Sequence, residues 1–430
     1  MRFKLHILYY LVLAYLSRAV RKRPWALAWL KAYRWKRLQK ALIKSPLYAP
    51  YAQKTLAEFP LSNKSFFMQH FDTINTLGIR KEEALQVALR SEESRDFNSL
   101  IGSTTVGLSS GTSGNKGVFL VTPRERAIWV ASILERAIGF SLQKRKVAFF
   151  LRANSKLYQS VDSSLLEFHF FDILKDSESL FQQCISLQPH ILVAPPSVLW
   201  ELKKYCKKHN QSLHPQKIIS VAEVLEKDQA IAMQQFFGQP IHQVYQCTEG
   251  FLAHTCSHGK LHLNEDWLII ERHYLDAEKS RFHPIVTDLL RWGQPIIRYE
   301  LNDILHEGAA CTCGLKTTVI DTIEGRSDDV FTFATDQGEV IIYPDFFRRA
   351  IIKAHDAIEN YVVKLINSST LSVYIEAPTL AQPSEAFGAV QNALKNLLQQ
   401  KGIPSVDIIW SKEIGLLPGQ KFKRIINVSR

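Results

Sequence analysis

Short apolar runs alternate with helical patterns through the middle of the chain, and this alternation limits the possible folds more than any other sequence feature. The runs that we expect to be buried strands are VAFFL at 147–151, HILVAPP at 190–196, KIISVAE at 217–223 and IHQVYQC at 241–247. Helical patterns separate them at 123–139, 197–209 and 226–237. Strands and helices in this order indicate an α/β domain whose sheet is covered on both faces.

The length and composition predict more than one folded domain. The chain has 430 residues, 46% of them hydrophobic and 22% charged, and a single core rarely serves that length. We expect a basic helical region at 1–96, an α/β core at 97–327 that is rich in strands from about Leu261, and a small α+β domain at 328–430. The small domain is predicted from a hairpin at DQGEV, helices at 344–355 and 384–400, and strands at YVVKLI, LSVYIEA and VDIIW.

Positive charge is concentrated at the start of the chain. Thirteen of the 53 Lys and Arg residues precede the first acidic residue, Glu58, so the rest of the chain has 40 basic and 41 acidic residues. A nucleic-acid-binding protein with a basic surface throughout is therefore disfavoured.

Residues 3–45 are predicted to be helical, with a break or a helix start at Pro24. Two interpretations of this arm are open. In the first, which we favour, the arm folds on the protein's own surface. In the second, it is a peripheral helix attracted to anionic lipid or to an acidic partner. The apolar run Leu5–Leu16 is too short to span a bilayer, and no small-residue cleavage site follows it. Together with only six cysteines, this favours a cytoplasmic protein.

The segment LSSGTSGNKG at 108–117 has the composition of a phosphate-binding loop. Its glycines allow close backbone approach, its hydroxyl groups can donate to oxyanions, and its lysine adds positive charge. It has neither the Walker pattern nor the dinucleotide-binding glycine spacing, and a Ser/Gly loop alone is most often a flexible connection. The candidate phosphate-binding residues are Ser109, Ser110, Gly111, Thr112, Ser113, Gly114 and Lys116.

Four further segments follow this loop in an order that carries a family resemblance. They are VYQCTEG at 244–250, RYELNDI at 298–304, EGRSDDVF at 324–331 and GQKFKRI at 419–425. With the loop, they resemble the motifs of the adenylate-forming superfamily, and within it the phenylacetate-CoA ligase and coenzyme F390 synthetase branch, over residues 100–430. The resemblance implies a large α/β domain of the acyl-CoA synthetase type and a small mobile C-terminal domain.

The resemblance also implies roles for residues in the VYQCTEG motif. Tyr245 is the candidate to stack on adenine, Thr248 to bind a phosphate oxygen, and Glu249 to ligate Mg²⁺. Without the flanking motifs, Glu249 would be interpreted as a solvated loop charge. The motif glycine is replaced here by Gln246, which would narrow the nucleotide site or mark a chain that has lost a catalytic step.

Three more residues are implied to contact the nucleotide. Asp303 corresponds to the family's ribose-binding carboxylate, Arg326 to a further ribose or phosphate contact, and Glu223 to a segment that lines the adenine pocket. For Glu223 the alternative is a buried carboxylate at the end of a strand.

The C-terminal domain is implied to supply a mobile cation. Lys421 is the candidate, and Lys423 and Arg424 are its close rivals because Gln420 departs from the commoner Gly-Lys spacing. Asp328 resembles the residue about which this domain rotates between two half-reactions.

The activity implied is ATP- and Mg²⁺-dependent activation of a small carboxylic acid, with an aryl acid expected. The acyl-adenylate would then pass its acyl group to a thiol, either CoA or the phosphopantetheine of an acyl carrier protein. The alternative is a non-catalytic nucleotide-binding protein that acts at a membrane or a partner through its basic helix.

A second group of residues has the chemistry of a metal site. HTCSHGKLH and CTCG offer Cys256, His258, His262, Cys311 and Cys313. We expect the three cysteines to hold a structural Zn²⁺ with either histidine as the fourth ligand, and the branch is similar in having cysteines at corresponding places. The alternative is three reduced thiols.

Overall fold

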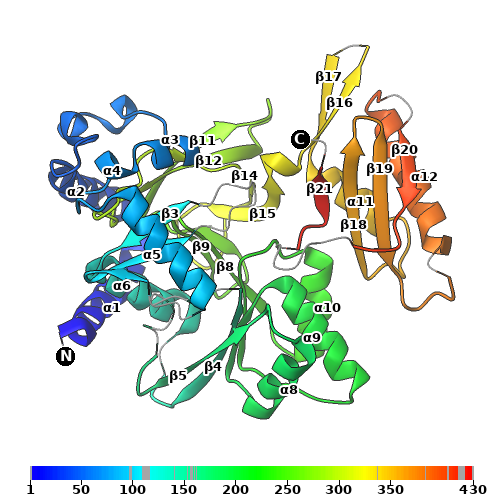
Figure 1. Ribbon diagram of the computed structural model, residues 1–430, viewed down its shortest axis with the longest axis horizontal. Helices are drawn as coiled ribbons and strands as arrows, with labels where there is room; N and C mark the ends of the chain where they lie inside the picture. Colours follow the sequence, from blue (N-terminus) through cyan, green and yellow to red (C-terminus); the bar gives the residue numbers. More distant parts are fainter. Residues whose placement is uncertain are drawn as a thin grey trace. The chain divides into compact units, whose positions relative to one another are not determined.

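The computed structural model describes residues 2–95, 99–108, 117–139, 141–152, 154, 158, 160, 162–336, 338–382, 384–403, 406–414 and 422–428. They form two compact units (Figure 1). The larger unit comprises residues 1–301 and 306–322, and the smaller one comprises residues 302–305 and 323–430. The mixed α/β class expected from the alternating pattern is confirmed.

The basic N-terminal region is helical, as predicted. Its helices are α1 (Arg2–Arg21), α2 (Pro24–Leu42), α3 (Lys64–Gln69), α4 (Phe71–Ile74) and α5 (Lys81–Ser94), with 3-10 turns η1 (Ala49–Tyr51) and η2 (Leu56–Glu58). Pro24 begins α2, where its missing N–H group costs nothing. Residues 3–21 meet the length and composition of a membrane-spanning helix. The apolar run Leu5–Leu16 covers only part of this helix, so the sequence alone underestimated the length of the helical segment.

Parallel strands form the part of the sheet that the apolar runs predicted. They are β4 (Arg145–Leu151), β5 (Leu166–Asp172), β6 (Ile191–Ala194), β7 (Lys217–Ser220) and β8 (Ile241–Cys247), in the order β8-β7-β6-β4-β5. The helices are α6 (Pro123–Ile133) with the π-helical turn η3 (Leu134–Ile138), α8 (Ser177–Leu187), α9 (Pro196–Lys208) and α10 (Lys227–Phe237). Strand β5 was not predicted from the sequence, and α8 was expected only as a helix around Cys184, without bounds.

Alternate residues of β4 enter two different cores, which explains its continuous apolar run. Ala148 and Phe150 pack with residues of α8, α9 and α10. Val147 and Phe149 pack on the other face with residues of α2 and α6. Strand β8 differs from the expectation of a buried strand, because all of its residues are only partly buried.

The strands after β8 extend the same sheet. They are β9 (Gly250–Thr255), β10 (Leu261–Leu263), β11 (Leu268–Tyr274), β12 (Arg281–Asp288), β13 (Tyr299–Glu300), β14 (Asp303–Glu307) and β15 (Val319–Arg326). Strand β9 pairs antiparallel with both β8 and β10, so the strand-rich part joins the α/β sheet instead of forming a sheet of its own. The chain passes between the two units three times: after Leu301, within β14 and within β15.

A small antiparallel sheet carries the Ser/Gly loop. It consists of β1 (Leu100–Ile101), β2 (Thr104–Leu108) and β3 (Val118–Val121). Gly107 of β2 faces Phe119 of β3, and a Cβ atom at Gly107 would lie 2.2 Å from the Phe119 ring. The segment between β2 and β3 is thus followed by a strand. In a Walker loop, by contrast, the N-terminus of a helix follows directly.

The smaller unit has its own core and matches the predicted α+β order. It contains the 3-10 turn η4 (Ser327–Asp329), the hairpin β16 (Phe331–Thr335) and β17 (Gly338–Ile342), helices α11 (Pro344–Ile352) and α12 (Ser384–Gln400), and strands β18 (Asn360–Asn367), β19 (Thr370–Glu376), β20 (Asp407–Trp410) and β21 (Ile425–Asn427). The four last strands form a sheet in the order β20-β19-β18-β21.

Candidate active site

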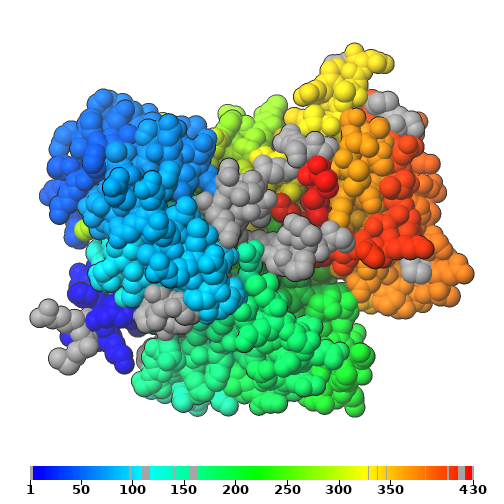
Figure 2. All heavy atoms as spheres, viewed as in Figure 1, coloured from blue at the N-terminus to red at the C-terminus, as the bar shows by residue number. Residues whose placement is uncertain are grey.

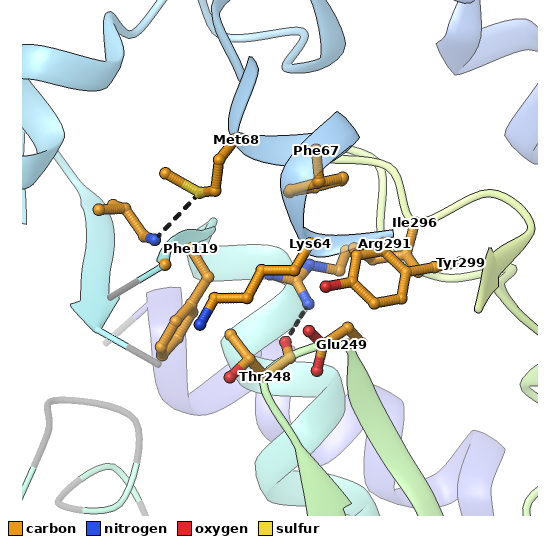
Figure 3. A pocket seen from close by; sticks show the side chains of 11 residues that line it. Lys64, Phe67, Met68, Phe119, Thr248, Glu249, Arg291, Ile296 and Tyr299 are labelled. Carbon is orange, nitrogen blue, oxygen red and sulfur yellow. Dashed lines mark hydrogen bonds between the residues drawn. The ribbon is translucent and has the colours of Figure 1, made fainter. Parts of the chain in front are cut away.

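A two-residue turn between β8 and β9 presents Thr248 and Glu249. Cys247 pairs with Gly250 across the hairpin, so the two residues between them stand at its tip. Both side chains line a small pocket in the larger unit (Figure 3). A short turn between two paired strands holds these side chains in place with little freedom.

The pocket also brings in the described end of the Ser/Gly loop. Gly117 lines it together with Thr248 and Glu249. The loop residues proposed to bind phosphate, 109–116, lie outside the described residues. The residue that immediately follows them is nevertheless placed beside the candidate Mg²⁺ ligand.

Two cations line this pocket, and neither was predicted from the sequence. Arg291, which is 8% exposed, donates hydrogen bonds to the Thr248 carbonyl oxygen at 2.5 Å and to the Leu120 carbonyl oxygen at 3.3 Å. It thus ties the β8–β9 turn to strand β3. Lys64 comes from the first turn of α3, and its side chain extends into the pocket toward Phe119 and Thr248 (Figure 3).

No sequence signal marks Lys64 or Arg291 as site residues. Lys64 directly follows Asn63, whose side chain caps α3 by accepting from the Phe66 N–H group at 3.0 Å. A lysine after a helix cap is common on protein surfaces. Only the packing of α3 against the rest of the unit brings it to the β8–β9 turn.

Two buried acidic groups near the β8–β9 hairpin have raised pKa values. Burial raises the pKa of the Tyr299 phenol, and neighbouring Glu249 raises it further. The neutral phenol is turned toward Glu249 (Figure 3). Burial also raises the pKa of Asp288 to about 6, although its carboxylate accepts a hydrogen bond from the Leu290 N–H group at 2.9 Å. Among the described residues that line the pocket, Glu249 is the carboxylate.

The neighbouring residues of the VYQCTEG motif also have defined partners. The Trp129 indole donates a hydrogen bond to the Gln246 amide oxygen at 3.0 Å, so this replacement of the motif glycine is held in place. Tyr245 is partly buried and packs against the main core. Its role in stacking on adenine stays a prediction.

Glu223 has a structural partner in addition to its predicted role. It lies in the loop after β7, and its carboxylate accepts a hydrogen bond from the Ser197 N–H group at 3.2 Å. Ser197 is in the first turn of α9, where a carboxylate is favoured by the helix dipole. This contact fits a carboxylate at the end of a strand, but Glu223 is half-buried and not buried as that alternative expected.

The smaller unit brings Asp303 and Arg326 together. The Arg326 Nε atom lies 3.3 Å from the Asp303 Oδ1 atom, and the Asp303 residue is 9% exposed. The two candidate ribose contacts are thus neighbours, and their roles toward the nucleotide stay predictions. Asp328 lies in the 3-10 turn η4.

Both rivals of Lys421 have structural partners. The Lys423 Nζ atom pairs with the Asp329 carboxylate at 2.7 Å. Arg424 is 5% exposed and lies 4.7 Å above the centre of the Tyr361 ring. Both therefore have structural partners, whereas Lys421 lies outside the described residues and stays the predicted cation.

Four of the five predicted metal ligands converge. The ligand atoms of Cys256, His262, Cys311 and Cys313 all lie within 4.8 Å of one another. The Cys256 and Cys311 sulfur atoms are 3.8 Å apart, and the Cys313 sulfur is 3.4 Å from His262 Nε2. His258 is not in this group, and its Nδ1 atom lies 3.0 Å from the Thr312 hydroxyl oxygen.

The ligand types are those that Zn²⁺ prefers. Ligands about 2.0 to 2.3 Å from one tetrahedral Zn²⁺ lie about 3.3 to 3.8 Å from each other. The Cys256–Cys311 and Cys313–His262 separations are close to this range, and all four ligand atoms lie within 4.8 Å of one another. The other His262 nitrogen, Nδ1, lies 3.2 Å from the Thr317 carbonyl oxygen, a partner that orients a ligating imidazole. The choice between the two histidines, open in the sequence, therefore favours His262.

Comparison with known proteins gives similarity at the level of structure only. No family model and no curated protein sequence matches the chain. A 2-hydroxyisobutyryl-CoA ligase, solved in the postadenylation state with its acyl-AMP, superposes with a TM-score of 0.68 at 14% identity. The match covers 94% of this chain and 89% of that ligase. The chain has the fold of the adenylate-forming ligases.

Two further solved structures have this fold. The GH3.15 acyl acid amido synthetase superposes with a TM-score of 0.57 at 12% identity, over 89% of this chain and 85% of that one. An anthranilate CoA ligase in complex with anthranoyl-AMP has a TM-score of 0.52 at 12% identity, over 73% of this chain and 65% of that one.

Proposed function

We propose that the protein uses ATP to activate a carboxylic acid as an acyl-adenylate and then transfers the acyl group to an acceptor. The observation that carries the proposal is the pocket at the tip of the β8–β9 hairpin. It combines Thr248 and Glu249 with two cations and the end of the Ser/Gly loop, in a chain with the fold of adenylate-forming ligases.

The pocket residues suit the first half-reaction. An oxygen of the acid's carboxylate attacks the α-phosphorus of ATP, and the bond to the leaving pyrophosphate breaks. Negative charge develops on phosphate oxygens, which cations placed beforehand stabilise. Lys64 and Arg291 supply such cations, Thr248 offers a hydroxyl donor, and Glu249 would hold Mg²⁺, which supplies further positive charge to the phosphates.

The second half-reaction passes the acyl group to the acceptor. A thiol sulfur attacks the acyl carbon, the bond to AMP breaks, and the thiol proton leaves to solvent. We propose a thiol acceptor, CoA or a carrier-protein phosphopantetheine, and an aryl acid, as in the phenylacetate-CoA ligase branch. Two of the similar structures are CoA ligases with bound acyl-AMP, and one is an amido synthetase. An amine acceptor therefore belongs in the same assay.

Acid-dependent exchange of labelled pyrophosphate into ATP tests the proposal. A panel of aryl and aliphatic acids should include at least one that raises exchange well above the rate without acid, and removal of Mg²⁺ should abolish that increase. Product analysis with CoA, a phosphopantetheine carrier and amino acids then identifies the acceptor. Tight ATP binding with no acid-dependent exchange across the panel would instead support the non-catalytic alternative.

Replacement of Lys421 by Ala should lower the adenylation rate by a factor on the order of 10², because a fixed cation at the attacked phosphate would be lost. The matched control is Lys423→Ala, since Lys423 pairs with Asp329 and should act on stability instead. Pyrophosphate exchange with the best acid is the measurement. Loss of exchange in Lys423→Ala alone would reverse the assignment.

We also propose that Cys256, His262, Cys311 and Cys313 hold one structural Zn²⁺ that joins the β9–β10 hairpin to the loop that carries Cys311 and Cys313. Elemental analysis should find about one zinc per chain, and Cys311→Ser or His262→Ala should lower both the zinc content and the melting temperature. His258→Ala and Cys247→Ser should retain the zinc, because neither residue belongs to the cluster. Zinc loss in His258→Ala with retention in His262→Ala would contradict the assignment.

A further inference from the structure

Helix α1 exposes an apolar face along its length. Leu5, Leu8, Val12 and Leu16 follow the helical repeat, and Tyr9 and Leu13 lie beside them. Their exposed fractions run from 38% for Leu13 to 63% for Leu16. A contiguous apolar surface of this kind marks an interaction site, because removing apolar surface from water lowers the free energy.

The opposite face of α1 is held by the protein. Ala14, Ser17 and Arg21 are buried there. The Glu135 Oε1 atom lies 2.5 Å from Arg18 Nε and 2.6 Å from Arg21 Nη2. A helix that crossed a bilayer in this arrangement would carry a buried ion pair and its protein partner into hydrocarbon, which is costly. Although residues 3–21 are long enough to span, these contacts favour a helix that lies along a surface.

The surroundings of the exposed face are basic and aromatic. The turn between α1 and α2 has Lys22 and Arg23 exposed to solvent, and Trp25 after it is 70% exposed. Along α2, Trp29 is 64% exposed and stacks on Tyr33 with the ring centres 5.6 Å apart. Trp, Tyr, Lys and Arg beside an apolar helix face are the side chains found at the level of lipid headgroups.

The charge around this face decides between a second copy of the chain and anionic phospholipid as its binding partner. No acidic residue precedes Glu58. Lys22 and Arg23 have no ion-pair partner among the residues that the structure describes. Two copies meeting through this face would bring the same cations together by symmetry, which is unfavourable. Anionic phospholipid offers both an apolar layer and negative charge.

From these observations we infer that α1 binds the surface of an anionic phospholipid bilayer. The face formed by Leu5, Leu8, Tyr9, Val12, Leu13 and Leu16 enters the boundary between headgroups and acyl chains. Lys22 and Arg23 contact the phosphates. The active-site unit is thereby held at a membrane, where apolar acids partition.

Sedimentation with vesicles tests the inference. The full chain should bind vesicles with about 30% phosphatidylserine, and weakly bind or not bind pure phosphatidylcholine. The triple variant Leu8→Ser, Val12→Ser, Leu16→Ser should lower the partition coefficient at least about tenfold. The matched control is Leu142→Ser, Leu174→Ser, Ile231→Ser, which removes exposed apolar side chains elsewhere and should bind as the wild type does.

The electrostatic part has its own variant. Lys22→Glu with Arg23→Glu should lower binding at least about tenfold and weaken its dependence on salt, whereas Lys207→Glu with Lys208→Glu should not. Melting temperatures equal to that of the wild type show that the variants fold.

Three results would overturn the inference. The first is that the wild type does not sediment with anionic vesicles. The second is equal binding by the wild type and the triple α1 variant. The third is a stable dimer in solution that the triple variant dissociates, since a second copy would then occupy the face.

Discussion

The variant Glu249→Gln should lower acid-dependent pyrophosphate exchange by a factor on the order of 10² to 10³. The amide has the size and hydrogen-bonding shape of the carboxylate but lacks its charge, so it binds Mg²⁺ poorly. The turn position between Cys247 and Gly250 should be unaffected, because the strand pairing involves only backbone groups. The rate of exchange should recover in part at high Mg²⁺ concentration.

The matched control for this variant is Glu278→Gln, which removes an exposed carboxylate from the turn between β11 and β12. Its exchange rate should equal that of the wild type. Tyr299→Phe adds a second comparison, since it removes the phenol beside Glu249 and keeps the ring in the core. Unaltered exchange and Mg²⁺ dependence in Glu249→Gln would remove this residue from the reaction.

The variant Glu135→Ala should lower the free energy of unfolding of the larger unit by about 3 to 5 kcal/mol. The Glu135 side chain is 2% exposed and pairs with Arg21, whose side chain is 3% exposed. Removal of the carboxylate leaves a buried guanidinium group without its counter-charge. Denaturant unfolding followed by tryptophan fluorescence measures the change.

The neighbouring Asp266 shows how strongly this region depends on charge pairing. Burial by itself raises the pKa of Asp266, but the guanidinium groups of Arg136, Arg21 and Arg34 outweigh it and hold the pKa below its usual value. The Arg136 Nη2 atom lies 2.7 Å from the Asp266 Oδ2 atom. Glu135 therefore belongs to a buried group of alternating charges, and removal of one charge destabilises the remaining charges of the group.

An exposed ion pair provides the control for Glu135→Ala. Lys144 pairs with Glu167 at 2.8 Å, and the Lys144 side chain is 61% exposed. Because water screens such a pair, Lys144→Ala should leave the free energy of unfolding nearly unchanged. Similar losses in the two variants would show that burial of Glu135 does not strengthen its contacts.

Local sequence patterns were sufficient to predict most helices and strands, but not how deeply each of them is buried. The helix predicted at 384–400 has those bounds in the structure. Its buried apolar residues recur every four residues throughout the segment, so the helical pattern can be recognised without knowledge of the rest of the chain. Strand β5, Leu166–Asp172, was missed because its residues are mostly half-buried and alternate with polar side chains. Strand β8 was found, but its partial exposure depends on which elements cover it.

The candidate sites divide in the same way. Motif order indicated Thr248 and Glu249, which the structure places together at one pocket. It did not indicate Lys64, which belongs to a short helix far away in the chain and has no motif of its own. For the metal, the sequence supplied the ligand types, while the choice of His262 over His258 required coordinates.

The amino-acid sequence alone determined the α/β class, the order of motifs and the chemical types available for nucleotide and metal. These follow from hydrophobic period, turn chemistry and side-chain groups, all of which act over a few residues. Only the tertiary structure decided which cations stand beside Glu249, which histidine joins the thiols, and which face of α1 remains exposed. Those outcomes depend on packing between segments far apart in the chain, and local pattern does not encode such distances.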